Sequence, residues 1–434
     1  MANVYLISGG GNWSNGAVWN TGTIPTAADD VFSNNFTVNV DVSFTVLSLR
    51  STASAPIVAG GSFNFNTAGV TGTVTSANPL VPGATNMVQI TATTGTVTLS
   101  LGGNVAPRNV TNDILINYSG NCNFTILGGN NINGTTNGST VTTINKTSAG
   151  TITITCNLIG SNTTNLGSNN VLSSTNGNTV IIGNIVGPIS TSGTSNRAIN
   201  QSAGTLTVTG NVTGGQGAST NQGILFSGTS LTVNGNILGG TVAVGIDTSS
   251  PINNIIGNVT GGTVSAISSI SANTLNVTGI VTASATSPAI TMTNANGQVY
   301  LNGNMVNNNG KMAIFAPIVW LDTTGTTSAA FFTSGGVART LYSADTVPNQ
   351  PAQNNVRFNT VYGPGNSLTG TCVMPVSANS RNGVVYDNGT TGTALFTTSL
   401  FLTELSSSTV PVAVRMQNLC TPQILGELME AYKR

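Results

Sequence analysis

The 434-residue chain is poor in charge. It has eleven Lys plus Arg, eleven Asp plus Glu and no histidine, so its formal net charge is zero. Charged residues make up 5% of the sequence, against about a quarter in an ordinary globular protein. A nucleic-acid interface needs clustered Lys and Arg to neutralise phosphates, so this composition excludes one. The absence of histidine excludes a Ser–His relay, and no cofactor is expected.

Cysteines and long apolar runs are also scarce. Cys122, Cys156, Cys372 and Cys420 show no CxxC spacing. We therefore expect no metal site and interpret them as small buried hydrophobic residues. No apolar stretch approaches the 18 or so residues that span a bilayer, so membrane insertion is not expected. Residues 1–8 lack the basic segment and apolar run of a secretory signal peptide.

The few carboxylates are poorly placed for catalysis. Glycoside hydrolysis generally uses two carboxyl groups within about 5 to 10 Å. Asp29 and Asp30 are adjacent, so in a strand they would point to opposite faces, and a turn or cap role is favoured. Asp247 has no acidic neighbour within a repeat on either side, and Arg197 lies about two repeats away. We expect no catalytic residues and no enzyme.

What the sequence does contain is a repeated phrase. Alternating apolar residues are followed by glycine, asparagine and another apolar residue, as in residues 206–212 and 231–237. Successive asparagines are 22 to 27 residues apart, except for one interval of two such steps. A fixed period in this range is typical of a solenoid. The predicted turn asparagines are Asn104, Asn130, Asn157, Asn184, Asn211, Asn236, Asn258 and Asn304.

The repeat predicts an all-β fold, a right-handed parallel β-helix. Each coil advances by one strand spacing, about 4.8 Å, so nine coils between residues 97 and 306 would be about 43 Å long. Leu, Val and Ile at alternate positions point inward, while Thr and Ser point to water. Gly-Asn turns the chain, and stacked asparagines are expected to form a hydrogen-bonded ladder. An antiparallel β-sandwich remains the alternative, because short alternating strands with glycine-rich turns also fit it.

Changes in pattern divide the chain into five segments. Residues 1–50 form an N-terminal cap, 51–322 the β-helix, and 323–356 a closing segment and linker. Residues 357–416 form a β region with two hairpins 24 residues apart, beginning near Arg357 and Arg381. Residues 417–434 predict a short α-helix, with one apolar face that could dock on a partner or on its own chain. That face consists of Ile424, Leu425, Leu428, Met429 and Tyr432.

Two segments resemble known families. Residues 11–49 carry Trp13, Trp19, a proline, Asp-Asp-Val and alternating valines. They resemble the opening segment of bacterial and phage β-helix surface proteins, including those related to the G8 domain. This resemblance implies architecture, with the two tryptophans covering the first coil. Arg-x-x-x-Val-Tyr followed by Leu-Thr-Gly-Thr, near residues 357–371, resembles C-terminal segments of phage virion proteins.

These resemblances imply a non-enzymatic structural protein of a bacteriophage particle, a tail fibre, tail spike or head fibre. Such a protein is made in the host cytoplasm and released by lysis, which agrees with the absence of a signal peptide. The resembled families imply a homotrimer attached to other virion proteins. A host-surface glycan is the expected ligand, contacted by neutral polar groups and aromatics such as Tyr118, Tyr300 or Tyr342. A bacterial surface adhesin is the first alternative, and a glycan depolymerase, a lyase or hydrolase of the kind β-helices host, is the second.

Overall fold

The computed structural model describes most of residues 2–343 and four short strands beyond them. The gaps before residue 343 are 8, 84–85, 106–112, 130, 135–140, 164–166, 191–194, 218–220, 270–273, 284–286, 295–296, 303–304, 308–313, 317 and 322–339. Beyond it, residues 361–362, 368–369, 385–386 and 390–391 are described. The chain divides into two units, Met1–Thr346 and Val347–Arg434.

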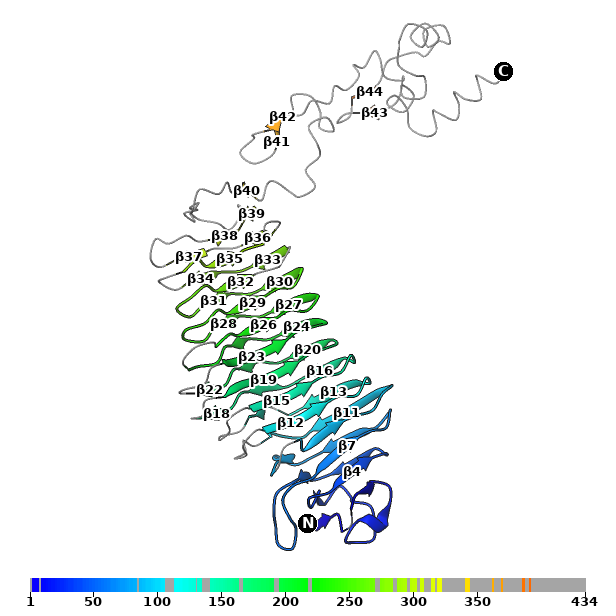
Figure 1. Cartoon of the computed structure of the whole chain (residues 1–434). Helices are drawn as coiled ribbons and strands as arrows, with labels where there is room; N and C mark the ends of the chain where they lie inside the picture. The colour runs from blue at the N-terminus through cyan, green and yellow to red at the C-terminus, as the bar shows by residue number, and fades with distance from the viewer. Residues whose placement is uncertain are drawn as a thin grey trace, which may run out of the picture. The chain divides into compact units, whose positions relative to one another are not determined.

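Two long parallel sheets run the length of the first unit (Figure 1). Sheet I contains, in spatial order, β2 (Gly11–Asn12), β4 (Thr37–Val40), β7 (Ser62–Phe65), β10 (Val88–Ile90), β12 (Asp113–Tyr118), β15 (Val141–Lys146), β19 (Ser168–Ser174), β23 (Ser195–Gln201), β26 (Ile224–Phe226), β29 (Ile246–Thr248), β32 (Ile267–Ser269), β35 (Ile290–Met292) and β38 (Ile314–Phe315). Sheet II contains β5 (Phe44–Val46), β8 (Thr71–Val74), β11 (Thr96–Leu101), β13 (Asn123–Gly128), β16 (Ile152–Ile154), β20 (Thr179–Ile182), β24 (Thr205–Thr209), β27 (Ser230–Asn234), β30 (Ile252–Ile256), β33 (Thr274–Thr278), β36 (Gln298–Asn302), β39 (Ile318–Leu321) and β40 (Thr340–Ser343).

Shorter sheets complete the coils. Sheet III contains β14 (Asn131–Asn133), β17 (Asn157–Ile159), β21 (Ile185–Val186), β25 (Val212–Thr213), β28 (Ile237–Leu238), β31 (Val259–Thr260), β34 (Val281–Ala283) and β37 (Met305–Asn307). Sheet IV, at the N-terminal end, contains β1 (Asn3–Tyr5), β3 (Asp30–Phe32), β6 (Ser48–Arg50) and β9 (Leu80–Val81). A separate pair joins β18 (Asn162–Thr163) to β22 (Ile189–Ser190), and η1 (Gly16–Val18) is a single 3₁₀ turn.

The pairings within sheets I to IV are parallel and join each strand to the equivalent strand one coil on. The predicted parallel β-helix is therefore confirmed, and the antiparallel sandwich is wrong. Residues 50–96 already belong to the coils, since β7, β8 and β10 lie in sheets I and II. The physical reason is the inward column of aliphatic side chains, which is continuous only if the coils stack. In sheet II it consists of residues at most 1% exposed: Leu99, Ile126, Ile154, Ile181, Val208, Val233, Ile255 and Val277.

Glycines turn the chain between sheets II and III. Gly210, Gly235, Gly257 and Gly279 have φ between 141° and 154°, a region that favours glycine. Each also lies against the carbonyl of the glycine one coil earlier. A Cβ at any of the four would approach that oxygen to 2.1–2.3 Å. Both the backbone conformation and the close stacking of coils therefore require glycine here.

The second unit is described only at two antiparallel hairpins. In one, β41 (Val361–Tyr362) pairs with β42 (Leu368–Thr369). In the other, β43 (Val385–Tyr386) pairs with β44 (Thr390–Thr391). Both pairs lie in the segment for which the sequence predicts two tandem hairpins. The expected terminal α-helix, residues 417–434, lies outside the described residues.

Candidate functional site

An asparagine ladder follows the corner between sheets II and III. The side-chain Oδ1 of Asn184 accepts a hydrogen bond from the main-chain N–H of Asn211 at 2.9 Å, and Asn211 accepts from Asn236 in the same way at 2.9 Å. The same arrangement links Asn157 to Asn184 at 2.8 Å and Asn236 to Asn258 at 2.9 Å. It ends where the Oδ1 of Asn258 accepts from the N–H of Ile280. The ladder is therefore made of side chain to main chain bonds rather than of stacked amides alone.

Near the start of the ladder, Asn131 takes the place predicted for Asn130. Asn104 accepts from the N–H of Asn131 at 3.0 Å, and Asn131 pairs in register with Asn157. Asn130 and Asn304 lie outside the described residues. Gly128 pairs in register with Leu101, so Asn131, three residues further on, holds the corner position that Asn104 holds in the preceding coil.

Removing one rung of the ladder should have a modest cost. Because Asn211 is exposed, water replaces part of the lost bond. Asn211→Ala is expected to lower the free energy of unfolding by about 1 kcal/mol or less. Asn211→Asp retains an acceptor oxygen and should lie closer to the wild type in the same denaturant titration. An alanine variant at least as stable as the wild type would contradict a stabilising ladder.

The two predicted cap tryptophans fill the bore of the first coils. Trp13 and Trp19 are each 1% exposed and meet edge to face, with ring centroids 5.1 Å apart. Trp13 stacks on Phe44 at 4.1 Å. The indole Nε1–H of Trp19 donates to the carbonyl of Trp13 at 3.1 Å. The tryptophans thus complete the apolar column at its N-terminal end, next to the short edge strands β1 and β2.

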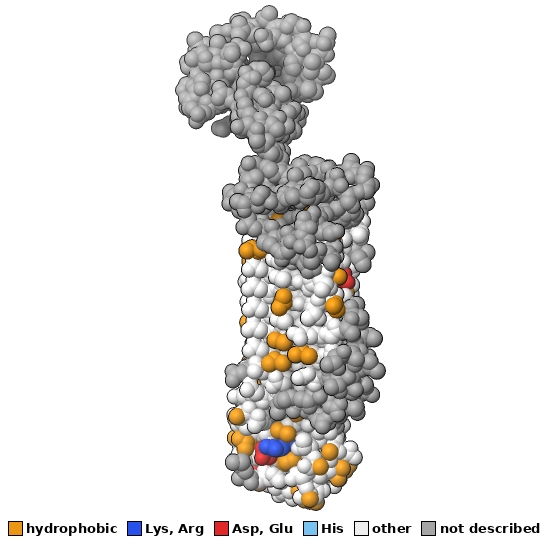
Figure 2. All heavy atoms as spheres, turned by 90° about the vertical axis from the view of Figure 1, so that its left-hand side faces the viewer, with side chains coloured by type: hydrophobic (Ala, Val, Ile, Leu, Met, Phe, Trp, Pro, Cys, Tyr) orange, Lys and Arg blue, Asp and Glu red, His pale blue; other side chains and the backbone are white. Residues whose placement is uncertain are grey.

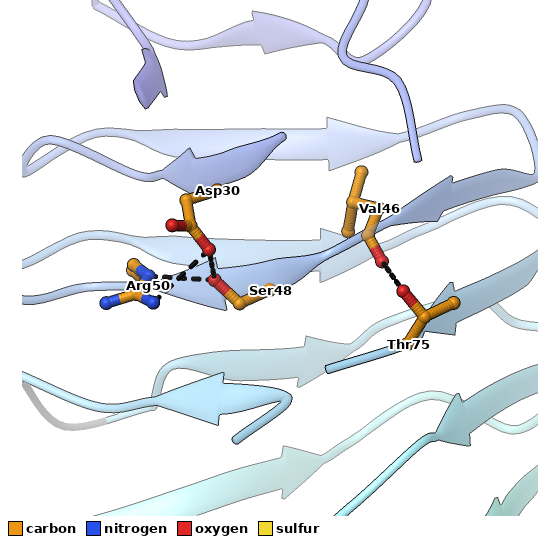
Figure 3. Close-up of polar contacts among 5 residues, drawn as sticks. All are labelled: Asp30, Val46, Ser48, Arg50 and Thr75. Atoms are coloured by element: carbon orange, nitrogen blue, oxygen red, sulfur yellow. Dashed lines mark hydrogen bonds and ion pairs between the residues drawn. The ribbon is translucent and has the colours of Figure 1, made fainter. Parts of the chain in front are cut away.

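A small charged cluster holds the strands of sheet IV together (Figure 3). Asp30 and Arg50 form an ion pair at 3.2 Å, and the hydroxyl of Ser48, which receives a hydrogen bond from Arg50 Nε at 2.7 Å, donates to Asp30. Figure 3 also shows the neighbouring Thr75 hydroxyl donating to the carbonyl of Val46. Asp29 accepts from the N–H and hydroxyl of Thr26. Both candidate acids of this segment are thus engaged in turn and strand contacts.

A second charged group crosses three coils on the outside of sheet I. Arg197 Nε donates to Gln222 Oε1 at 2.6 Å, and Gln222 Nε2 donates to Asp247 Oδ2 at 3.2 Å. Burial raises the pKa of Asp247, an effect opposed by the hydrogen bond from Gln222 and by the charge of Arg197. Burial likewise lowers the pKa of Arg197. The amide of Gln222 therefore bridges two partly desolvated charges that lie two coils apart.

One lysine lies inside the bore. Lys146 is fully buried and pairs in register with Tyr118, over whose ring its Nζ lies 5.6 Å from the centroid. Its ammonium donates to the carbonyl of Ser148 at 2.7 Å and to that of Asn176. Tyr118 is itself fully buried and donates to the carbonyl of Cys122. The expectation that Tyr118 is an exposed aromatic is therefore wrong, because its position in β12 faces the bore.

Lys146 should make stability depend on pH. Burial lowers its pKa from 10.5 to about 8, so the unfolded chain holds this proton more tightly than the folded protein. The buried lysine therefore lowers the free energy of unfolding most below pH 8, and this destabilisation decreases as the pH rises toward 10.5. Relative to Lys146→Met, wild-type unfolding free energy is expected to rise by about 1 kcal/mol between pH 7 and pH 9. Parallel denaturant titrations measure this difference.

The comparison between pH 7 and pH 9 isolates the ionisation of Lys146 from that of neighbouring groups. Burial raises the pKa values of Tyr118 and Cys156 to about 12. These groups therefore lower the free energy of unfolding as the pH rises through the pKa values that they have in the unfolded chain. Because both proteins carry them, their effects cancel in the comparison to a first approximation. A difference between wild type and Lys146→Met that is flat from pH 7 to pH 9 would contradict a depressed lysine pKa.

The described cysteines are buried thiols. Cys122 and Cys156 are free and buried, and burial raises the pKa of each. Cys372 and Cys420 lie outside the described residues, as do the candidate assembly-helix residues Ile424, Leu425, Leu428, Met429 and Tyr432. Within the described ranges, no group of three or more His, Cys, Asp or Glu is placed to hold a metal ion. No described helix is long and apolar enough to cross a membrane.

The outer surface is mostly neutral and polar. Figure 2 shows the side that bears sheet III, largely white, with scattered hydrophobic side chains and with blue and red groups side by side near the N-terminal end. Exposed aliphatic residues on this part of the coils include Val186 and Leu238. Chemically, such a surface offers hydroxyl and amide groups with isolated apolar contacts.

Sequence reasoning missed a second amide ladder, on the outside of sheet I. Asn64 donates to Asn39 at 3.2 Å, and Asn145 donates to Asn117 at 3.0 Å. Both pairs lie at one register position that runs through β4, β7, β10, β12 and β15. Little in the sequence indicates this ladder, because no repeated motif surrounds these asparagines.

Comparison with known proteins returned no match: none to a family model, none among curated proteins and none among solved structures.

Proposed function

We propose that the chain is a non-enzymatic structural protein of a bacteriophage particle, a rigid β-helical fibre or spike. In this role it attaches to other virion proteins, assembles as a homotrimer and contacts a host-surface glycan. The observation that carries the proposal is the stack of coils around a mainly aliphatic bore, with uncharged, hydrogen-bonded corners between sheets II and III. A stack of near-identical coils resists bending because each coil bonds to its neighbours along every face.

The features at the two ends support the same role. The tryptophans at the N-terminal end complete the bore. They thereby shield the edge of the first coil, whose unpaired strands would otherwise pair with other chains. The opening segment resembles bacterial and phage β-helix surface proteins, and the segment of the tandem hairpins resembles C-terminal segments of phage virion proteins. Two of the described charged clusters, Asp30–Arg50 and Arg197–Gln222–Asp247, make contacts between coils.

Immunogold labelling tests the proposal. Antibodies against the purified chain are expected to label particles released by lysis of the source culture, at the tail or on the head. Labelling of intact bacterial cells without labelling of particles would instead identify a surface adhesin. Release of reducing sugars from host capsule or lipopolysaccharide by the purified chain would overturn the non-enzymatic assignment.

Light scattering tests the subunit number separately. The chain has a mass of 43.7 kDa, and the proposal expects a folded species of three times that mass. A fully folded, monodisperse monomer would contradict the trimer and would leave the particle assignment to be decided by the labelling.

A further inference from the structure

A tight turn joins sheet I to sheet II between β19 and β20, at residues 175–178. It contains Asn176 followed by Gly177, and a glycine in second place lets the asparagine side chain and the next main-chain nitrogen approach each other freely. Asn176 is exposed, so water reaches its side chain. Gly177 has a φ of 69°, and a Cβ there would lie 2.4 Å from the carbonyl oxygen of Ala149 in the preceding coil. The fold therefore requires an Asn-Gly pair's glycine at this turn.

The main-chain nitrogen of Gly177 lies against the side chain that follows from this pairing. Its N–H donates to Oδ1 of Asn176 at 2.8 Å, and the electrophilic carbon Cγ is one bond from that oxygen. The Asn-Gly pair at Asn234 is different, because the N–H of Gly235 donates to the carbonyl of Ile256 at 2.8 Å in the next coil. Only at the first of these two pairs is the nitrogen directed at its own asparagine.

Two donors converge on the main-chain carbonyl oxygen of Asn176. The ammonium of Lys146 and the hydroxyl of Ser174 both donate to it, the hydroxyl at 3.2 Å, and both side chains are buried. Loss of the proton from the Gly177 nitrogen places negative charge on this same oxygen, because the peptide bond is delocalised. Donors fixed where charge develops stabilise it strongly in a site with little water. Lys146 and Ser174 therefore favour the anionic, nucleophilic form of the Gly177 nitrogen.

Lys146 lies in the bore without a carboxylate partner among the described residues. Its ammonium donates to the carbonyl oxygens of Ser148 and Asn176. The one ion pair within the described ranges joins Asp30 to Arg50. A buried ammonium without an opposite charge retains much of its desolvation cost. A carboxylate formed at Asn176 would remove part of that cost.

We propose that Asn176 converts to isoaspartate without an enzyme, through a succinimide formed with Gly177 and promoted by Lys146. First, the Gly177 nitrogen gives its proton to water and bonds to Cγ of Asn176. The bond from Cγ to Nδ2 then breaks, and ammonia leaves with a proton taken from water. Next, water adds to the main-chain carbonyl carbon of Asn176, and the bond from this carbon to the Gly177 nitrogen breaks. The chain now runs through Cγ, and the former main-chain carbonyl is a carboxylate.

The two donors also determine which product forms. Lys146 and Ser174 polarise the main-chain carbonyl of the succinimide and not the carbonyl at Cγ, so water should attack the former and give isoaspartate rather than aspartate. The new carboxylate contains the oxygen that already accepts from Lys146, and the ammonium gains a charge-assisted hydrogen bond. The inference is independent of the proposed function, because it depends on this turn alone.

Peptide mapping of the full chain by mass spectrometry tests this modification. Fresh protein is kept folded at pH 7, below the pKa of about 8 that burial gives Lys146, and a parallel sample is kept unfolded in guanidinium chloride. Tryptic peptide 147–197 has one Asn-Gly pair, and fragmentation distinguishes asparagine, succinimide, aspartate and isoaspartate at position 176. We expect Asn176 to convert faster in the folded chain than in the unfolded chain, with a larger share of isoaspartate. Asn234 should stay intact in the folded chain over the same time.

Variants that remove one donor test the cause. Lys146→Met should slow conversion in the folded chain at least about tenfold, and Ser174→Ala should slow it less. Both should shift the ratio of isoaspartate to aspartate toward that of the unfolded chain. Ser202→Ala is the matched control, because the Ser202 hydroxyl donates to the carbonyls of Ser174 and Thr175, and it should convert as the wild type does.

Thermal unfolding of each variant shows whether it is folded. Should Lys146→Met fail to fold, Ser174→Ala and the comparison of folded with unfolded wild type decide the result. Conversion no faster in the folded chain, aspartate as the main product, or an unchanged rate and product ratio in the folded donor variants would overturn the proposal. None of these outcomes bears on the labelling of particles, so the structural role is tested separately.

Discussion

Replacing Gly235 with alanine is expected to lower the free energy of unfolding by roughly 2 to 4 kcal/mol. Two costs combine at this corner. The φ of 154° is outside the range that alanine adopts easily. A Cβ at Gly235 would also lie 2.1 Å from the carbonyl oxygen of Gly210, which belongs to the backbone of the preceding coil. Relief of that contact requires two coils to move apart, and with them the ladder bond from Asn236 to Asn211.

Gly69→Ala is the matched control for the backbone cost alone. Gly69 has a φ of 78°, and no heavy atom beyond its chain neighbours lies within 4 Å of an added Cβ. Its substitution should cost about 1 to 2 kcal/mol from the positive φ alone. Denaturant titrations of the three proteins give the comparison. Equal losses in the two variants would mean that the contact between coils contributes nothing at the corner.

The winding of the chain was predictable from the sequence because two independent signals coincide. Alternating aliphatic residues fix which side of each strand faces the bore, and glycine followed by asparagine marks the corner. Leu206 and Val208 pair in register with Leu231 and Val233, as their repeated phrases indicate. In the coil of Gly128 and Gly129 the Gly-Gly-Asn phrase is one residue out of step with the strand register, since Gly128 and not Leu127 pairs with Leu101. The shift from Asn130 to Asn131 follows from this.

Contacts between coils were less predictable because loop lengths vary. Tyr300, Trp320 and Tyr342 are 20 and 22 residues apart, and no repeated phrase aligns them. The strand pairing alone places them in one row. The same limit hid the link from Arg197 through Gln222 to Asp247, since Gln222 lies in an irregular segment before β26.

Buried polar groups were the other surprise. In β15 the burial pattern has two consecutive inward positions, Thr143 and Ile144. This break in alternation turns Lys146 into the bore, so simple counting along the strand does not place it. Tyr118 is buried for the same geometric reason, in the register-paired position one coil earlier. Local irregularity in one strand is thus passed to its neighbours, because each coil must follow the backbone beneath it.

Trp13→Ala is expected to cost about 3 to 5 kcal/mol, the range for removing a large buried aromatic side chain. The ring stacks on Phe44 at 4.1 Å and meets Trp19 edge to face at 5.1 Å. Its loss would open a cavity at the end of the apolar column, where β2 is only two residues long. Denaturant titration measures the loss of stability.

A second effect of Trp13→Ala separates the role of a cap from that of ordinary core packing. If the tryptophans protect the first coil, the variant should form concentration-dependent aggregates through its exposed strand edges, as light scattering would detect. Trp13→Phe keeps an aromatic ring against Phe44 and should lose less stability and aggregate less. Phe226→Ala, a buried residue in the middle of the rod, should lose stability to a similar extent without that aggregation at concentrations where both variants remain folded. Equal aggregation by the two alanine variants would mean that Trp13 fills the core but does not shield the end, since only a residue at the end of the stack can expose an unpaired coil.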